Sequence, residues 1–259
     1  MRITANDIDI NCRIDGLADA PWLILSNSLA TNLSMWNEQS DFFSDRYRVL
    51  RYDQRGHGLT DAPPGRYDFN ILIRDVIALM DSLSIERAHF CGLSMGGATA
   101  MGLAQQHPER LNKVIICDSP CASSPAAAQQ WEERIDLAQS KGMTALVDST
   151  IERWFPAETI AAAPPHISRI RQMILTTPIN GFVGCAAALA DHDFRSMIST
   201  VQAPVLFIAG QKDGATPAAM QQLQSQLPGS QFVELPEAGH ISNLDRPDLF
   251  NHVLSDFLA

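Results

Sequence analysis

Gly92-Leu93-Ser94-Met95-Gly96 reads Gly-x-Ser-x-Gly and stands between a strand-like and a helix-like segment. The apolar residues 88–91 precede it and the small residues 97–104 follow it. This context is typical of a nucleophile elbow, in which a sharp turn raises a serine hydroxyl above the edge of a sheet and glycines let strand and helix approach closely. We therefore predict that Ser94 is a catalytic nucleophile. The alternative is a glycine-rich turn that carries a solvated serine.

Short apolar segments that are typical of buried strands lie on both sides of this motif. They alternate with helical periods, of which residues 71–83 show the clearest, with apolar side chains three and four positions apart. Residues 8–14 instead alternate with a period of two, which is typical of a half-exposed antiparallel strand. Alternating strands and helices predict an α/β fold whose mostly parallel sheet is covered by helices on both faces. The buried-strand candidates are residues 22–25, 47–52, 88–91, 114–117, 204–209 and 231–235.

Residues 121–193 interrupt this alternation. Strand patterns disappear there, and Ala, Pro and helical spacings such as Trp131-Ile135-Ala138 take over. We interpret residues 121–193 as a helical cap inserted into a core domain of residues 1–120 and 194–259, and expect it to enclose a water-poor pocket above the elbow. The alternative is that these are further packed helices of a single domain.

A serine hydroxyl is a weak nucleophile, so it needs a base and an acid that orients the base. Of the seven histidines, His240 is the best candidate base, because it lies on a loop between a strand candidate and a helical pattern. Asp213 directly follows the preceding strand candidate and is the predicted acid, with Asp118, after another strand, as the alternative. The order Ser94, Asp213, His240 is that of α/β-hydrolases. The other histidines stand at less suitable positions: His57, His89, His107, His166, His192 and His252.

Attack by a serine on a carbonyl group develops negative charge on the carbonyl oxygen, which two backbone N–H groups can stabilise. We assign these donors to Met95, which follows the serine, and to Leu29, in the loop after the strand candidate 22–25. Residues 53–60 form a second glycine-rich stretch, Asp53-Gln54-Arg55-Gly56-His57-Gly58-Leu59-Thr60. We interpret it as a scaffold, in which polar side chains bind the backbone of a tight loop.

Composition limits the remaining possibilities. The chain of 259 residues has a formal net charge of −10 and 46% hydrophobic residues, which suits one α/β domain with an insertion and argues against nucleic acid or an anionic membrane as a partner. Five cysteines, an odd number without close CxxC pairs, and an N-terminus without an apolar signal core favour a reduced, cytoplasmic protein. We find no phosphate loop, dinucleotide fingerprint or clustered metal ligands, so no cofactor and no metal is expected. The oligomeric state is not determined.

With these residues in place, the chain resembles the α/β-hydrolase superfamily over its whole length, and more closely the 3-oxoadipate enol-lactonases of the β-ketoadipate pathway. The resemblance is carried by residues 26–31 (Ser-Asn-Ser-Leu-Ala-Thr) with Met35-Trp36, by residues 52–58 and 91–97, and by Arg153-Trp154-Phe155. It implies a mostly parallel eight-stranded sheet with helices on both faces and an inserted helical cap. It also implies hydrolysis of 3-oxoadipate enol-lactone to 3-oxoadipate, with acyl-enzyme formation or direct attack by water as the alternatives.

The implied substrate carries a carboxylate, which an acidic protein must bind with locally placed cations. Arginine suits this task because its planar fork binds a carboxylate through two hydrogen bonds. Two pairs in the cap are the candidates: Trp131 and Arg134, three positions apart on one helix, and Arg153 with Trp154. We predict that these four residues bind a small anionic lactone.

Two other functions fit the same residues. A broad-specificity carboxylesterase or cofactor-free perhydrolase would use the same Ser, His and Asp, because these groups do not encode the acyl group of the substrate. A hydrolase fold retained as a low-turnover small-molecule receptor is the second alternative. Turnover of neutral esters would favour the former, and a stoichiometric burst without steady-state turnover the latter.

Overall fold

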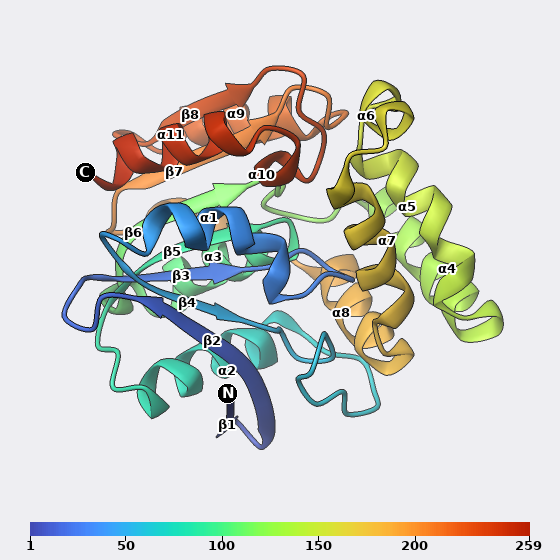
Figure 1. Ribbon diagram of the computed structural model, residues 1–259, viewed down its shortest axis with the longest axis horizontal. Coiled ribbons are helices and arrows are strands. Elements are labelled where there is room, and N and C mark those ends of the chain that lie inside the picture. The colour runs from blue at the N-terminus through green and yellow to red at the C-terminus, as the bar shows by residue number, and fades with distance from the viewer.

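The computed structural model describes the backbone of residues 1–259 and every side chain except that of Ile198. Over this backbone the chain forms an eight-stranded sheet in the order β1-β2-β4-β3-β5-β6-β7-β8 (Figure 1). β1 and β2 pair with each other antiparallel, and β2 pairs antiparallel with β4, whereas all the later pairs are parallel. The predicted fold class, a mostly parallel α/β sheet, is confirmed. The strands are β1 (Arg2–Ala5), β2 (Ile8–Gly16), β3 (Trp22–Ser26), β4 (Arg48–Tyr52), β5 (Ala88–Leu93), β6 (Leu111–Cys117), β7 (Val205–Gly210) and β8 (Gln231–Leu235).

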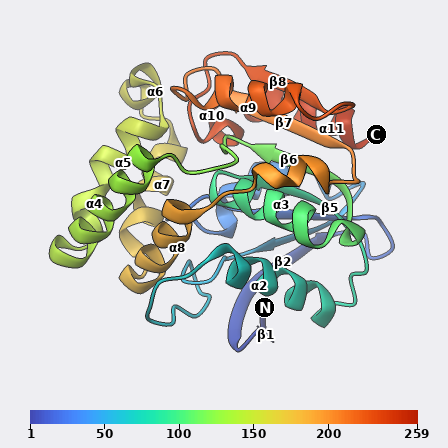
Figure 2. The same cartoon turned by 180° about the vertical axis from the view of Figure 1, so that it is seen from behind.

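Helices cover both faces of the sheet, which is why its central strands are mostly apolar. All residues of β7 are buried, as expected for a parallel strand with helices on both sides. α1 packs on α11 on one face, while α2 packs on α3 on the opposite face (Figure 2). The core helices are α1 (Asn37–Phe43), α2 (Phe69–Ser82), α3 (Met95–Gln106), α9 (Thr216–Ser225), α10 (Ser242–Asp245) and α11 (Pro247–Leu258), with 3-10 turns at η1 (Leu33–Trp36), η2 (Pro108–Arg110) and η4 (Arg195–Ser199).

Five consecutive helices from residues 121–193 lie together beyond the carboxyl ends of the parallel strands (Figures 1 and 2). We call this group the helical cap. An isolated bridge between Ala122 and Asp193 joins the two ends of the insertion. The glycine pair Gly56 and Gly181 brings the cap against the core so closely that a Cβ at Gly181 would lie 1.9 Å from the Gly56 carbonyl oxygen. The cap helices are α4 (Pro125–Lys141), α5 (Val147–Trp154), α6 (Ala157–Ala162), α7 (Pro165–Thr176) and α8 (Ile179–Asp191), with the 3-10 turn η3 (Met143–Leu146).

Among the described residues, no single helix has the length and apolar character needed to cross a membrane. α7 and α8 meet that test only when taken together, and they are bent by 99° where they join.

Candidate functional site

Ser94 occupies the junction between β5 and α3 with a strained backbone. Its φ of 56° and ψ of −111° lie in a region that non-glycine residues rarely adopt. The Ser94 N–H donates to the Cys117 carbonyl oxygen on the adjacent strand at 2.8 Å, which holds the turn. A Cβ at Gly92 would lie 1.9 Å from the Gly96 carbonyl oxygen, and a Cβ at Gly96 would lie 2.1 Å from that of Ser26. The two motif glycines are therefore required by close backbone approach.

Asp213 and His240 meet across the loops that follow β7 and β8. The His240 Nδ1–H donates to Asp213 Oδ2 at 2.8 Å, and the two side chains are only 10% and 11% exposed. This contact orients the ring and directs the other nitrogen, Nε2, away from the carboxylate. Nε2 is buried and has no hydrogen-bond partner among the described groups, so it is available to take a proton.

One cavity of about 420 Å³ is lined by Ser94, Asp213 and His240 together. Its walls come from the ends of β6 and β7 and from cap helices α4, α5 and α8. The structure thus places a hydroxyl, an imidazole and a carboxylate from three distant parts of the chain around one cavity, although no hydrogen bond joins Ser94 Oγ to His240 Nε2. Sequence reasoning had not singled out several polar residues that also line it, because they stand in loops and helices without a motif: Ser119, Ser123, Gln130 and Thr216.

Asp118, the alternative acid, has other partners. Its buried carboxylate accepts hydrogen bonds from the Gly210 N–H at 2.7 Å and from the Ser242 hydroxyl at 2.5 Å. Burial raises its pKa well above that of an exposed aspartate, and the nearby charge of Asp213 adds to this effect. Asp213 is therefore the carboxylate that binds the imidazole. Asp118, which follows β6, instead binds Gly210 at the end of β7 and Ser242 at the start of α10.

The loop that carries His240 is held by the cap and by a further carboxylate. The His240 N–H donates to the Trp154 carbonyl oxygen at 2.8 Å, and the Trp154 ring stacks on the imidazole with centroids 6.0 Å apart. The Gly239 N–H donates to Asp245 Oδ2 at 2.7 Å. Burial raises the pKa of Asp245 to about 6, although the bond from Gly239 opposes this shift. Trp154, predicted to contact substrate, is thus buried behind His240 and does not line the cavity.

The two amides assigned to oxyanion binding follow β3 and β5, which are paired neighbours in the sheet. The Gly96 N–H donates to the Asn27 carbonyl oxygen at 3.1 Å, which places the loop after β3 against the first turn of α3. Leu29 and Met95 are buried, and within the described part of the chain neither backbone N–H donates to another group. A developing oxyanion requires free N–H groups close to the nucleophile. Leu29 and Met95 are not among the residues that line the cavity of Ser94, so their role as donors stays a prediction.

Arg153 and Trp131 together form one wall of the cavity, and Arg153 supplies its positive charge. The Arg153 guanidinium lies 5.1 Å from the centre of the Trp131 ring, and both residues line the cavity. Arg134 lies 5.8 Å from the same ring but donates to Thr150 Oγ1 at 2.6 Å and is not among the lining residues, contrary to the predicted substrate contact. Desolvation lowers the pKa of Arg153, although the nearby charge of Asp213 opposes this shift. Desolvation lowers the pKa of Arg134 to about 10, and the charge of Arg153 adds to this effect. Among the described side chains, neither guanidinium forms an ion pair with a carboxylate.

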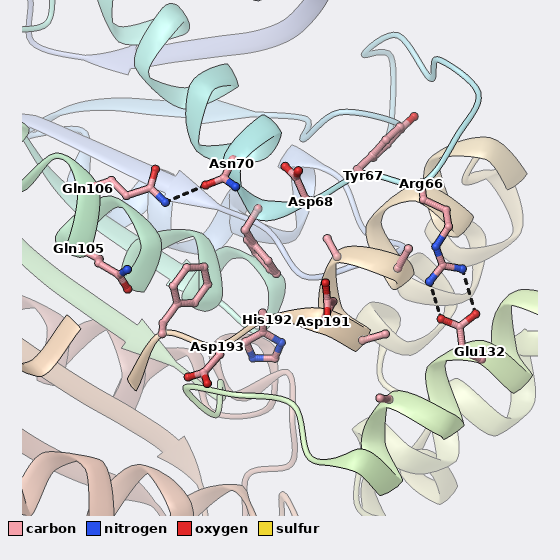
Figure 3. Close-up of a pocket in the computed structure, with 16 residues that line it drawn as sticks. Arg66, Tyr67, Asp68, Asn70, Gln105, Gln106, Glu132, Asp191, His192 and Asp193 are labelled. Atoms are coloured by element: carbon pink, nitrogen blue, oxygen red, sulfur yellow. Dashed lines mark hydrogen bonds and ion pairs between the residues drawn. The ribbon is translucent and has the colours of Figure 1, made fainter. Parts of the chain in front are cut away.

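A larger hollow of about 660 Å³ lies on the other side of His192, which lines both spaces (Figure 3). Figure 3 shows Asp68, Asp191 and Asp193 around it, with Arg66 paired to Glu132. His192 faces the backbone oxygens of Leu189 and Pro120 through its two ring nitrogens. This acidic hollow lacks a nucleophile and does not suit an anionic ligand.

No group of three or more metal-ligating side chains that could hold a metal ion occurs in the described residues.

Comparison with known proteins agrees with this geometry. The model of the alpha/beta hydrolase family matches residues 23–253. The chain is 40% identical over 252 residues to 3-oxoadipate enol-lactonase 2 of Acinetobacter baylyi, covering 97% of this chain and 94% of that protein. The crystal structure of the enol-lactonase from Burkholderia xenovorans LB400 is 39% identical, with a TM-score of 0.96 over 100% of this chain and 99% of that one.

A thermophilic esterase from Thermogutta terrifontis, solved with malate bound, is 26% identical with a TM-score of 0.94 and covers 100% of this chain and 98% of its own. The family model spans most of the chain, and the identity to the Acinetobacter protein extends over nearly all of it. The chain therefore belongs to the alpha/beta hydrolase family.

Proposed function

We propose that this protein hydrolyses 3-oxoadipate enol-lactone to 3-oxoadipate, using Ser94 as nucleophile. The observation that carries the proposal is the Arg153 guanidinium, which lines the same cavity as Ser94 and His240 without a carboxylate partner among the described residues. In a chain of net charge −10, an arginine that lines the cavity of the nucleophile and forms no ion pair among the described side chains favours a substrate that brings its own carboxylate. The similarity to two enol-lactonases supports the same substrate.

The reaction begins with attack of Ser94 Oγ on the lactone carbonyl carbon, while His240 Nε2 takes the hydroxyl proton. Asp213, bound to Nδ1, stabilises the imidazolium that forms. The Leu29 and Met95 N–H groups stabilise the carbonyl oxygen as it becomes negative. The ring C–O bond then breaks and releases an enol oxygen, which His240 protonates.

The enol isomerises to a ketone, which makes ring opening hard to reverse. Water, deprotonated by His240, attacks the acyl group on Ser94, and the serine takes back its proton. Arg153 binds the substrate carboxylate, with Trp131 beneath its guanidinium. Arg134 and Trp154 do not contact the substrate in this proposal. The Arg134 guanidinium packs on the Trp131 ring, and the Trp154 ring stacks on the His240 imidazole.

The first test follows loss of the enol-lactone absorbance with wild-type protein and with Ser94→Ala. Removal of a nucleophilic serine costs up to about 10⁶-fold in kcat, and we expect a loss of at least about 10³-fold. Retained turnover in Ser94→Ala would exclude the covalent route.

The second test examines the substrate carboxylate. Arg153→Ala should raise KM for the lactone by about 10- to 100-fold, since a hydrogen-bonded charge pair contributes roughly 1.5–3 kcal/mol, and should change KM for p-nitrophenyl acetate by less than about 3-fold. Arg171→Ala serves as the control, because Arg171 lies elsewhere in the cap and pairs with Asp148. Equal effects of Arg153→Ala on both substrates would contradict the proposal.

A carboxylesterase is the second candidate, favoured by the similarity to the Thermogutta terrifontis esterase. If p-nitrophenyl esters are hydrolysed by the wild type with a kcat/KM equal to that of the lactone, this candidate replaces the first.

A further inference from the structure

The stretch Asp53–Gly58, which the proposed chemistry does not use, lies beneath the loop that carries Leu29. Asp53 and Gln54 are 2% exposed and His57 is fully buried. Polar side chains that are buried to this extent must find hydrogen-bond partners inside the protein. Each of the three has a partner among the backbone groups of residues 27–33, which we call the oxyanion loop. Asp53 also accepts from the Asn11 side chain and the Leu59 N–H.

Three side chains of this stretch bind the oxyanion loop on both sides of Leu29. Gln54 Nε2 donates to the Asn27 carbonyl oxygen at 2.5 Å. His57 Nε2 accepts from the Ala30 N–H at 2.8 Å. Asp53 Oδ1 accepts from the Leu33 N–H at 2.7 Å. These bonds fix the loop at Asn27, two residues before Leu29, and at the peptide that directly follows Leu29, while the Leu29 N–H has no hydrogen-bond partner among the described groups.

The stretch is itself anchored. Arg55 binds both carboxylate oxygens of Asp75 with 2.7 and 2.6 Å contacts, and both side chains are almost fully buried. A fixed arginine–carboxylate fork gives the turn that follows a defined position. His57 therefore approaches the oxyanion loop from a rigid base.

The protonation of His57 follows from its surroundings. Burial lowers its pKa to about 4, so the ring is neutral near neutral pH. A neutral imidazole has one donor and one acceptor nitrogen. Nδ1 faces the Arg55 carbonyl oxygen at 3.1 Å and must carry the proton, which leaves the lone pair of Nε2 for the Ala30 N–H.

Ala30 needs this contact. Its φ of 57° places an alanine in the left-handed region, which costs roughly 1 kcal/mol or more per residue. Such a conformation persists when neighbouring groups determine it, and His57 is the side chain that binds its N–H.

We propose that His57 is a positioning residue, which holds the oxyanion loop so that the Leu29 N–H points at the reacting carbonyl oxygen. The inference rests on the proposed role of Leu29 in oxyanion binding. His57 does not touch substrate, and it acts through the Ala30 peptide.

The test compares His57→Gln with His57→Asn. A glutamine side chain can place an acceptor oxygen near the position of Nε2, whereas asparagine reaches only the position of Nδ1. Removing an oxyanion donor costs about 10²- to 10³-fold in kcat. We expect His57→Asn, which only releases the loop, to lower kcat about 10- to 100-fold with KM changed less than about 3-fold, and His57→Gln to recover most of that loss.

Two readouts separate positioning from general damage. The loss in His57→Asn should be equal for the lactone and for p-nitrophenyl acetate, because every acyl transfer forms an oxyanion. The affinity for phenylboronic acid, which forms a tetrahedral adduct with the serine, should fall by the same factor as kcat. His107→Asn is the control, since His107 lies at the end of α3, away from both loops.

Equal kcat values in wild type and His57→Asn would overturn the inference, as would a loss confined to KM. If the lactone proves not to be a substrate, the comparison is made with p-nitrophenyl acetate, so failure of the proposed function remains distinguishable. If His57→Asn does not fold, ¹H–¹⁵N spectra of the wild type decide: a His57 ring protonated on Nε2 at neutral pH would exclude the contact with Ala30.

Discussion

Ser94 keeps its unusual backbone conformation because its hydrogen bond to Cys117 and the close backbone packing at Gly92 and Gly96 hold the turn in place. A residue in such a region costs about 1–3 kcal/mol, which the Cys117 carbonyl and the two flanking glycines offset by holding the turn. As a result Ser94 lines the cavity from the N-cap position of α3. At this scale the pattern in the sequence and the geometry agree, since the glycines stand where a Cβ would collide with backbone.

Asp245 gives a prediction about pH and stability at the residue scale. Its pKa rises from 3.8 unfolded to about 6 folded, mainly through burial, so the folded state binds more protons between these two pH values. Stability contributed by this group is therefore greatest in acid and declines as the pH rises from about 4 to about 6, by at most about 3 kcal/mol.

Asp245→Asn should remove this dependence while leaving an acceptor for the Gly239 N–H. We expect the free energy of unfolding above about pH 7 to rise by about 1–2 kcal/mol, with a flatter profile between about pH 4 and pH 6. Urea unfolding at several pH values measures both. Asp248→Asn, at an exposed position of α11, is the control, and a fall in stability at neutral pH would contradict the expectation.

At the scale of elements, the strands differ in how visible they are in the sequence. The central strands are recognisable in the sequence as apolar runs, because both of their faces are buried. The position of β1 was not predicted, since this strand has only four residues, of which two are exposed. It forms by pairing with β2 through a turn at Asn6 and Asp7, both at positive φ.

The contact of α8 with the core predicts a sensitive position in the cap. A Cβ at Gly181 would meet the backbone of Gly56, which cannot move aside as a flexible side chain can. Gly181→Ala should lower the free energy of unfolding by about 1–3 kcal/mol, measured by urea denaturation, because overpacking forces backbone shifts. Asn180→Ala, its exposed neighbour in α8, should change stability by less than about 0.5 kcal/mol. Equal effects of the two substitutions would show that the close approach is dispensable.

For the molecule as a whole, charge affects an anionic substrate both at long distance and inside the cavity. The net charge of −10 repels an anion over long distances, whereas Arg153 attracts it only inside the cavity. Salt screens the first effect more than the second, because the Debye length falls from about 30 Å at about 10 mM salt to about 8 Å at about 150 mM.

We therefore expect kcat/KM for the anionic lactone to rise up to about 3-fold over this salt range, while that for p-nitrophenyl acetate stays constant. Steady-state kinetics in sodium chloride measure this difference. A fall in kcat/KM for the lactone would mean that local attraction dominates its approach.

The sequence by itself determined the α/β class, most strands, and the family, because burial on two faces and the serine elbow impose local patterns that neighbouring residues must satisfy. It also named Ser94, Asp213 and His240, which the chain brings to one cavity. Helical spacing showed that Trp131 and Arg134 share a side of α4, but not which of them meets the cavity.

Only the tertiary structure decided that Arg153 lines the cavity, that Arg134 binds Thr150, and that Trp154 lies behind His240. The same holds for His57 beneath Ala30. Each of these contacts joins segments far apart in the chain or on different helices. Their geometry depends on how the cap and the loops pack against the sheet, a long-range property for which residues close in sequence carry no local signal.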